Sequence, residues 1–235
     1  MKKNKFYKLV IENFKTLIGA LIIAILIRSL IIQPFYIPSS SMEPTLLVGD
    51  RIFVTKYNYG YSKHSFPFSP NVTNKRYFFS SPQRGDLVVF KTPADNRTDY
   101  IKRLIGLPGD EIQFINGDIL INGIKIKREN HNLETKVYCG NFILKSNTYL
   151  ETLPNGVKHL ATYNKEGTLK NTQKYKVPEK HYFLMGDNRD CSKDSRFLNE
   201  VGYIKELNLV GRAKMIFFSN DTRAGSLFKL WNLNK

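Results

Sequence analysis

The sequence is poor in the residues on which most metal sites and histidine-based active sites depend. Its 235 residues include two cysteines, Cys139 and Cys191, and four histidines. The cysteines lie far apart and form no metal-binding motif, and whether they pair in an oxidising compartment stays open at this point. None of the histidines lies in a motif, and a Ser-His-Asp arrangement would have to use His181. The sequence therefore predicts no metal site and no cofactor.

Long apolar runs are also scarce, and the one that could meet a membrane lies near the N-terminus. Residues 16–32 are almost wholly apolar apart from Arg28 and Ser29, and seventeen residues is the lower limit for a spanning helix. Residues 1–15 carry five lysines against one acid, which places the N-terminus in the cytoplasm and the chain after Gln33 outside it. No small-x-small cleavage site follows the run, so we expect an uncleaved anchor. A buried core helix is the alternative.

Acidic residues are few. Asp and Glu number 20 against 36 Lys and Arg, which gives a net charge of +16 and indicates an acidic partner. The sequence has no basic arm, zinc-ligand spacing or aromatic RNA-binding signature, so nucleic acid is not the expected partner. A basic surface beside a bilayer attracts anionic lipid, and membrane lipid is therefore the predicted partner.

Beyond the anchor, short apolar segments alternate with turns, and the sequence predicts a mostly β protein with little helix. Asn116-Gly117 and Asn122-Gly123 each lie between short apolar runs and are typical of hairpins. Residues 57–82 lack periodicity and indicate a long loop, whose aromatic side chains either enter the lipid headgroup layer or pack on the core. Strands are expected at 51–55, 87–90, 182–186 and 210–218, with another around Lys102.

Four parts are predicted along the chain. Residues 1–15 form a basic cytoplasmic N-terminus and 16–33 a transmembrane anchor. Residues 34–124 and 179–235 form a β-rich domain. Residues 125–178 are polar, basic and weakly patterned, and we expect an inserted smaller subdomain of strands and loops.

A serine run directly follows the anchor, in Ile37-Pro38-Ser39-Ser40-Ser41-Met42-Glu43-Pro44-Thr45-Leu46. The two prolines bias the residues before them toward extended backbone. Serine runs more often form turns or helix caps than active sites. A serine hydroxyl becomes a strong nucleophile only when a base takes its proton. The serine run therefore indicates an active site only if a base from elsewhere in the chain lies beside it.

The candidate base is Lys102, inside the apolar strand-like run from Asp99 to Asp110. Strand alternation puts Tyr100 and Leu104 on the same face as this lysine, where they would shield its stem from water. Burial lowers the pKa of a lysine and lets it act as a base. A strand lysine that reaches solvent is the alternative. We expect the amine to meet Ser41, as base and nucleophile.

A dense polar turn, Gly186 to Arg196, follows an apolar strand. A calcium loop is disfavoured because basic residues interrupt its carboxylates and no closing glutamate lies at the required offset. A network of Asx turns and Arg–Asp pairs is expected instead. In this network Asp187, Asp194 and Arg196 would brace the site, and Ser192 could offer its hydroxyl to the lysine amine.

Together these segments resemble type I signal peptidases, membrane-bound Ser/Lys endopeptidases that remove signal peptides. The resemblance covers most of the chain in order, and its four motifs after the anchor are 38–46, 84–90, 100–110 and 186–196. It implies a single-pass protein of the bacterial cytoplasmic membrane with its catalytic domain outside the cytoplasm. The implied substrates are signal peptides of exported preproteins, cut at small-x-small sites.

By this resemblance Ser41 is the nucleophile and Lys102 the general base. The Ser39 hydroxyl joins the Ser41 backbone N–H in the oxyanion hole. Ser192 orients the lysine, and Asp194 and Arg196 support it together with Asp187. The residues expected to line shallow apolar pockets for small substrate side chains are Phe35, Ile37, Pro38, Met42 and Ile101.

Two features depart from the family pattern. Cys191 stands where a small polar residue is expected, so a bridge to Cys139 would touch the catalytic turn. The sequence also shows one spanning helix where some members have two. The alternative function is a non-catalytic, membrane-anchored basic β-module that binds lipid or an envelope partner, in which Lys102 would keep its ordinary pKa.

Overall fold

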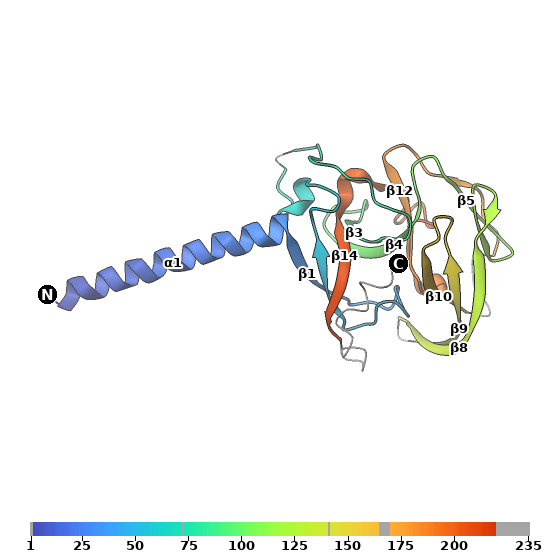
Figure 1. Ribbon diagram of the computed structural model, residues 1–235, viewed down its shortest axis with the longest axis horizontal. Helices are drawn as coiled ribbons and strands as arrows, with labels where there is room; N and C mark the ends of the chain where they lie inside the picture. Colours follow the sequence, from blue (N-terminus) through green and yellow to red (C-terminus); the bar gives the residue numbers. More distant parts are fainter. Residues whose placement is uncertain (1, 72, 141, 165–169, 220–235) are drawn as a thin grey trace.

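The computed structural model describes residues 2–71, 73–140, 142–164 and 170–219, and consists of one long helix joined to a β-rich domain (Figure 1). The predicted fold class, a mostly β protein behind an N-terminal apolar helix, is confirmed. The last part of the predicted β-rich domain, residues 220–235, lies outside the described residues.

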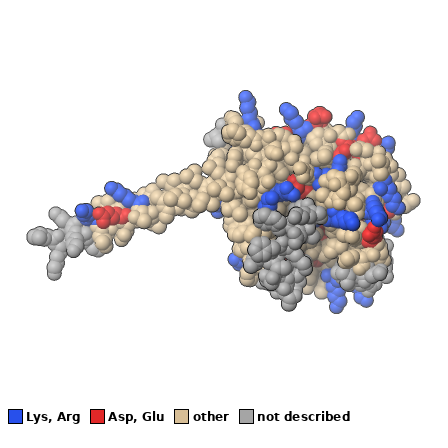
Figure 2. Space-filling view, in the orientation of Figure 1, with Lys and Arg blue, Asp and Glu red and all other residues tan. Residues whose placement is uncertain are grey.

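Helix α1, Lys2–Leu30, projects from the domain as a single rod (Figure 1). Its segment Tyr7–Leu30 has a mean hydropathy of 2.1, and apart from Ser29 near the domain its residues are not buried, so the alternative of a buried core helix is wrong. At about 1.5 Å per residue these 24 residues extend about 36 Å, which exceeds the ~30 Å hydrocarbon core of a bilayer. Figure 2 shows no charged side chain along the helix between its lysine-bearing N-terminal part and the domain. The helix therefore has the length and the surface of a membrane anchor.

The helix ends where the chain turns into an edge strand. Residues Ile32–Tyr36 form strand β1, so Gln33, which we assigned to the anchor, lies in a strand. Pro34 lacks the amide hydrogen that a central strand would need, and β1 is the edge strand of its sheet. Because β1 follows the helix at once, the serine run is held close to the membrane exit.

Six further strands join β1 in the main sheet. They are β2 Arg51–Thr55, β3 Leu87–Lys91, β4 Asp99–Gly106, β12 His181–Met185, β13 Ile204–Lys205 and β14 Leu209–Phe218. The order is β1-β2-β14-β3-β4-β12-β13, and every neighbouring pair is antiparallel. The predicted strands of this sheet are confirmed. The late strand β14 lies between β2 and β3, and β4 lies between β3 and β12.

A second sheet contains the two predicted hairpins. Its strands are β5 Glu111–Ile115, β6 Asp118–Ile121, β7 Ile124–Lys125 and β11 Tyr175–Lys176, in the order β11-β5-β6-β7. Asn116 and Asn122 have φ of 51° and 55°, and the glycines after them also have positive φ. Two successive positive φ values match the twist of paired strands, so both Asn-Gly hairpins are confirmed.

Three long strands form the third sheet, within the predicted insert. They are β8 Lys127–Cys139, β9 Phe142–Thr152 and β10 Lys158–Asn164, in the order β10-β9-β8. The sequence pattern here is weak because several buried positions carry polar residues, among them Thr148, Glu151 and His159. The sheet reaches the polar turn, since the Thr162 amide donates to the Asp187 carbonyl at 2.9 Å.

Residues 57–82 form the predicted long loop, with one short 3-10 turn, η1, at Lys63–Ser65. Among its aromatic side chains, Tyr59 packs in the core, whereas Phe68 and Phe78 are largely exposed. Arg76 fixes the loop by donating to the Tyr59 carbonyl at 3.2 Å and to neighbouring carbonyls.

The two cysteines are paired. Cys139, at the end of β8, forms a disulfide with Cys191 in the 3-10 turn η2, Arg189–Cys191. The bridge ties the third sheet to the polar turn across a sequence separation of 52 residues.

Loss of this disulfide should destabilise the domain. Cross-linking restricts the unfolded chain, and a loop of this length contributes about 2–4 kcal/mol. We expect the double variant Cys139→Ser/Cys191→Ser to unfold at lower denaturant than the oxidised wild type, followed by near-ultraviolet circular dichroism of the full chain in detergent. Reductant should lower the wild-type midpoint toward that of the variant and leave the variant unchanged. A wild-type midpoint insensitive to reductant would contradict the bridge.

Candidate active site

The structure brings the predicted serine and lysine together. A hydrogen bond joins Lys102 Nζ to Ser41 Oγ. Both residues are buried, with exposed fractions of 3% and 8%. The alternative of a lysine that reaches solvent is therefore wrong, and its amine lies against a hydroxyl that can lose a proton.

Lys102 and Ser41 are positioned by two different segments of the chain. Lys102 lies in the middle of β4, opposite Val88 of β3, so sheet pairing on one side fixes its backbone. The serine segment is a compact turn in which the Leu46 amide donates to the Met42 carbonyl at 2.9 Å. Met42 and Leu46 are both buried in an apolar cluster with strands of the main sheet. Burial of these two side chains fixes the segment against the main sheet and so positions Ser41, which directly precedes Met42.

The surroundings of Lys102 favour its neutral form. Burial lowers the pKa of its amine from 10.5 to about 8, since an ammonium loses its hydration there. The carboxylate of Asp194 opposes this shift, the Arg196 guanidinium adds to it, and Asp187 opposes it less. The ring of Tyr100 lies 5.6 Å from the amine and shields it as the strand alternation predicts. A large share of the amine is thus neutral at mildly alkaline pH.

Ser39 lies on the other side of the candidate nucleophile. Its Oγ is 3.3 Å from Ser41 Oγ. Among the described residues the Ser41 backbone N–H has no acceptor, so this amide and the Ser39 hydroxyl are both available to a third group. His181, by contrast, hydrogen-bonds the Glu179 carbonyl through Nδ1 at 2.7 Å, and no contact joins it to the serine.

The predicted polar turn is a network centred on Asp194. Its carboxylate accepts hydrogen bonds from Ser192 Oγ at 2.8 Å, from the Gly186 amide at 2.9 Å and from Arg196 at 2.8 Å. Burial alone would raise the pKa of Asp194, but Arg196 outweighs it and the pKa is lowered. Within the described part of the chain no hydrogen bond joins Ser192 to the lysine amine. A side chain at Gly186 would collide with Ser192 and the Ser41 carbonyl, so the turn and the serine segment are in close contact.

A second buried ion pair, between Arg103 and Asp187, lies beside the site. Asp187 Oδ2 accepts from Arg103 Nη2 at 2.7 Å, and from the Thr45 hydroxyl. Arg103 is wholly buried, and strand alternation puts it on the face of β4 opposite Lys102. This pair links β4, the serine segment and the polar turn, which carry the three sets of candidate residues.

Sequence reasoning missed the contacts of Asn188 and Tyr138. The Asn188 amide donates to the Ser41 carbonyl at 3.2 Å, and its Nδ2 donates to the Ser40 carbonyl at 3.1 Å. The Ser40 hydroxyl donates in turn to the Tyr138 carbonyl, and the Tyr138 amide donates to Glu43 Oε2 at 3.1 Å. Asn188 stands within a recognised motif and could have been proposed, whereas no sequence pattern marks Tyr138.

A cavity of about 280 Å³ opens beside the serine–lysine pair. Ser39, Ser41 and Lys102 reach it from one side. Four of the five predicted pocket residues line it: Phe35, Ile37, Pro38 and Ile101. The fifth, Met42, does not line it and lies in the core with 1% of its surface exposed. Within the described residues no group of three or more His, Cys, Asp and Glu could hold a metal ion.

These features define a class of protein: an anchored β-rich domain in which a serine hydroxyl contacts a buried lysine amine beside an apolar cavity. A sequence profile described as signal peptidase, peptidase S26, matches residues 10–218. The chain therefore belongs to the signal peptidase family and is a peptidase of that family.

The relatives agree over nearly the whole chain. It is 41% identical over 218 residues to a signal peptidase I of Rickettsia bellii (strain OSU 85-389), covering 88% of this chain and 73% of the relative. It is 42% identical over 229 residues to a signal peptidase I of Rickettsia typhi, covering 93% of this chain and 83% of the relative. The crystal structure of a signal peptidase I from Enterococcus faecalis V583 is 26% identical and covers 57% of this chain and 97% of its own, with a TM-score of 0.34.

Replacing the carboxylate at the centre of the polar turn should change the titration of the lysine. In Asp194→Asn the negative charge that stabilises the ammonium is lost and Arg196 is left unpaired, so the pKa of Lys102 should fall below about 8. Breaking the buried pair should also cost about 3–5 kcal/mol of stability. The Cε and Nζ chemical shifts of labelled lysine would report the pKa. Glu200→Gln, an exposed carboxylate paired with Lys193, is the matched control and should leave it unchanged. An unchanged or raised pKa in Asp194→Asn would contradict this account.

Proposed function

We propose that the protein is a membrane-anchored serine endopeptidase that removes N-terminal signal peptides from exported preproteins. Ser41 is the nucleophile and Lys102 the general base. The observation that carries the proposal is the hydrogen bond between these two buried side chains. Membership of the signal peptidase family supports the substrate class.

The reaction begins with a proton transfer. Neutral Lys102 takes the hydroxyl proton of Ser41 while Oγ attacks the scissile carbonyl and forms a tetrahedral oxyanion. The Ser39 hydroxyl and the Ser41 N–H donate to that oxyanion and lower the barrier. The ammonium then protonates the leaving amine as the peptide bond breaks. Water attacks the acyl-serine with the amine again as base, which releases the signal peptide and restores the enzyme.

The polar turn keeps the amine in place for this cycle. Ser192 is the base-orienting residue, and its hydroxyl is fixed by Asp194, which Arg196 holds in turn. The Asp187–Arg103 pair supports the same turn from within the core.

The cavity beside Ser41 selects small substrate side chains. Its walls are the rigid side chains of Phe35, Ile37, Pro38 and Ile101, and a volume of about 280 Å³ is at the low end for ligand pockets. Small apolar side chains match these apolar walls. Small residues at the first and third positions before the cut are therefore the preferred substrates.

The membrane topology follows from the anchor. The lysine-rich N-terminus stays in the cytoplasm, and the domain lies outside the bacterial cytoplasmic membrane, where exported preproteins emerge. Membrane lipid is the second partner, because the basic domain and the apolar helix both contact the bilayer. The Cys139–Cys191 bridge fits this placement, since disulfides persist outside the cytoplasm.

Removing either member of the pair should abolish processing. Ser41→Ala lacks the nucleophile and Lys102→Met lacks the base, so each should reduce kcat/KM for a preprotein by about a thousandfold or more. Ser40→Ala is the matched control, because the Ser40 hydroxyl bonds the Tyr138 carbonyl and not the amine. It should stay within about tenfold of wild type, the loss that one neutral hydrogen bond explains. Processing by Ser41→Ala or Lys102→Met at a near wild-type rate would refute the roles.

The pH dependence of cleavage should reflect the pKa of the Lys102 amine. The base works only when neutral, and burial lowers the pKa of Lys102 to about 8. Log kcat/KM should therefore rise by about one unit per pH unit below pH 8 and level off above it, because the amine is deprotonated there. Cleavage of a short signal-peptide substrate between about pH 5.5 and pH 10 measures this. A plateau that begins near pH 6.5 would indicate a histidine base instead.

A further inference from the structure

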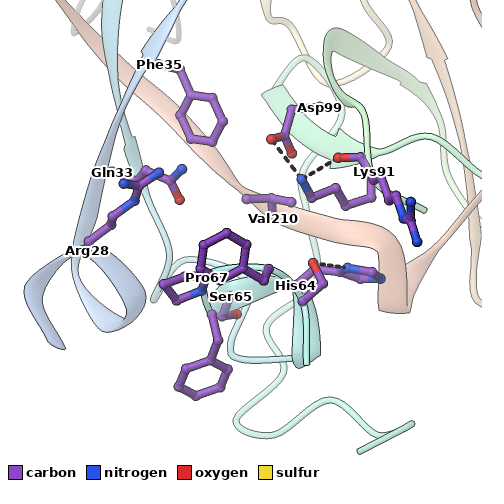
Figure 3. Close-up of a pocket in the computed structure, with 13 residues that line it drawn as sticks. Arg28, Gln33, Phe35, His64, Ser65, Pro67, Lys91, Asp99 and Val210 are labelled. Atoms are coloured by element: carbon purple, nitrogen blue, oxygen red, sulfur yellow. Dashed lines mark hydrogen bonds and ion pairs between the residues drawn. The ribbon is translucent and has the colours of Figure 1, made fainter. Parts of the chain in front are cut away.

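A second cavity lies where helix α1 joins the domain, apart from the serine–lysine pair. Its volume is about 570 Å³, within the range of ligand sites. Figure 3 shows its walls: Arg28 from the last turn of α1, Phe35 from β1, Val210 from β14, Lys91 and Asp99 from the ends of β3 and β4, and His64 from the long loop.

The charges in this cavity are unbalanced. Three cations line it, Arg28, Lys91 and Arg97, against one carboxylate, Asp99. Asp99 is already paired, since its Oδ2 lies 2.9 Å from Lys91 Nζ. Neither guanidinium has an acidic partner among the residues that the structure describes. Two forked cationic groups thus share one cavity with no anion to neutralise them.

His64 adds a neutral donor to the same wall. It is 3% exposed, and its Nδ1 lies 2.9 Å from Ser69 Oγ. Burial, with Lys63 and Lys91 nearby, lowers the pKa of His64 to about 4, so the ring is neutral. When Nδ1 accepts from the serine hydroxyl, the hydrogen is on Nε2, and this buried nitrogen has no partner within the described residues. A buried donor without an acceptor costs free energy unless an acceptor is supplied.

The electrostatic potential is also positive around the residues next to the cavity. Burial and the nearby charges of Lys91, Arg28 and Arg76 lower the pKa of Lys56 to about 8, and the opposing effect of Asp99 does not restore it. The groups that act on Lys56 and His64 are therefore almost all cationic. An anion in the cavity would relieve this repulsion.

The position of the cavity indicates where such an anion comes from. Arg28 lies in the last turn of α1, two residues before the apolar segment ends at Leu30, where its long side chain can reach the headgroups of a bilayer. The loop beside it presents Phe66 and Phe68, of which Phe68 is fully exposed, toward the same side as the helix end. Aromatic rings beside a cationic pocket suit a ligand with an anionic head and apolar chains.

We propose that this cavity binds the phosphate of a membrane phospholipid, between the guanidinium groups of Arg28 and Arg97, with the acyl chains lying along α1 and the exposed phenylalanines. Guanidinium groups bind phosphate oxygens in pairs of parallel hydrogen bonds, which a flexible lysine cannot do. The site rests on the membrane anchoring proposed above and would hold the domain at a set height over the lipid surface.

Lipid retention by the full chain tests the site. Protein in neutral detergent is titrated with phosphatidylglycerol, with its glycerophosphoglycerol headgroup and with inorganic phosphate, and binding is followed by native mass spectrometry. The imidazole nitrogen shifts of His64 provide a local signal, because a bound phosphate should raise its pKa. We expect Arg28→Gln/Arg97→Gln to weaken binding of phosphatidylglycerol by at least about tenfold, since two charge-assisted contacts are lost.

Two further variants sharpen the test. Lys145→Gln/Lys158→Gln removes the same charge from exposed positions on the third sheet and should bind lipid as the wild type does. Asp99→Asn removes the one repulsive carboxylate and should tighten binding. Equal affinity of wild type and Arg28→Gln/Arg97→Gln, or no His64 response, would overturn the site. Binding of inorganic phosphate as tight as that of phosphatidylglycerol would overturn the lipid assignment.

This result is independent of peptide cleavage. Ser41→Ala should retain lipid as the wild type does, because its hydroxyl does not line the cavity. Failure of the lipid site would leave the pair of Ser41 and Lys102 untouched, and an inactive pair would leave lipid retention unchanged.

Discussion

The rest of this structure depends on one interaction, the hydrogen bond between the buried amine of Lys102 and the hydroxyl of Ser41. An exposed ammonium would hold its proton at every physiological pH, and the pKa of Lys102 is lowered because the amine is buried between the main sheet and the serine segment. Burying a charged or strongly polar group costs free energy, and the hydrogen bonds and ion pairs around Lys102 offset that cost.

Two buried ion pairs are among those contacts. The pair of Arg103 and Asp187 crosses from β4 to the polar turn, and the pair of Arg196 and Asp194 closes that turn on itself. Buried pairs add little stability over apolar packing, but breaking one is strongly destabilising. They therefore act as geometric constraints, which hold three distant segments in one register around Ser41.

The membrane end of the molecule imposes the second constraint. The edge strand β1 follows α1 after one residue, so the anchor and the serine segment are separated by a single short strand. The cavity lined by Phe35 and Ile101 therefore lies close to the point where α1 joins the domain. The cationic cavity around Arg28 lies at the same junction and relates the height of the domain to the lipid surface.

The sequence by itself determined the local features of this protein. Apolar composition marked the anchor, β-branched runs marked the strands, and the Asn-Gly pairs marked the hairpins, because each depends on neighbours a few residues apart. The motif residues from Ser39 to Arg196 could be named from the resemblance to a family. Residues 125–178 could not be drawn as three long strands, since Thr148, Glu151 and His159 place polar groups where a strand pattern requires apolar ones.

Only the tertiary structure decided which residues meet. It paired Cys139 with Cys191, put Tyr138 against Ser40, left Met42 in the core and gathered Arg28, His64 and Arg97 around one cavity. These contacts join positions tens of residues apart. The physical reason is that burial and charge pairing depend on distance in space, which the chain order does not record.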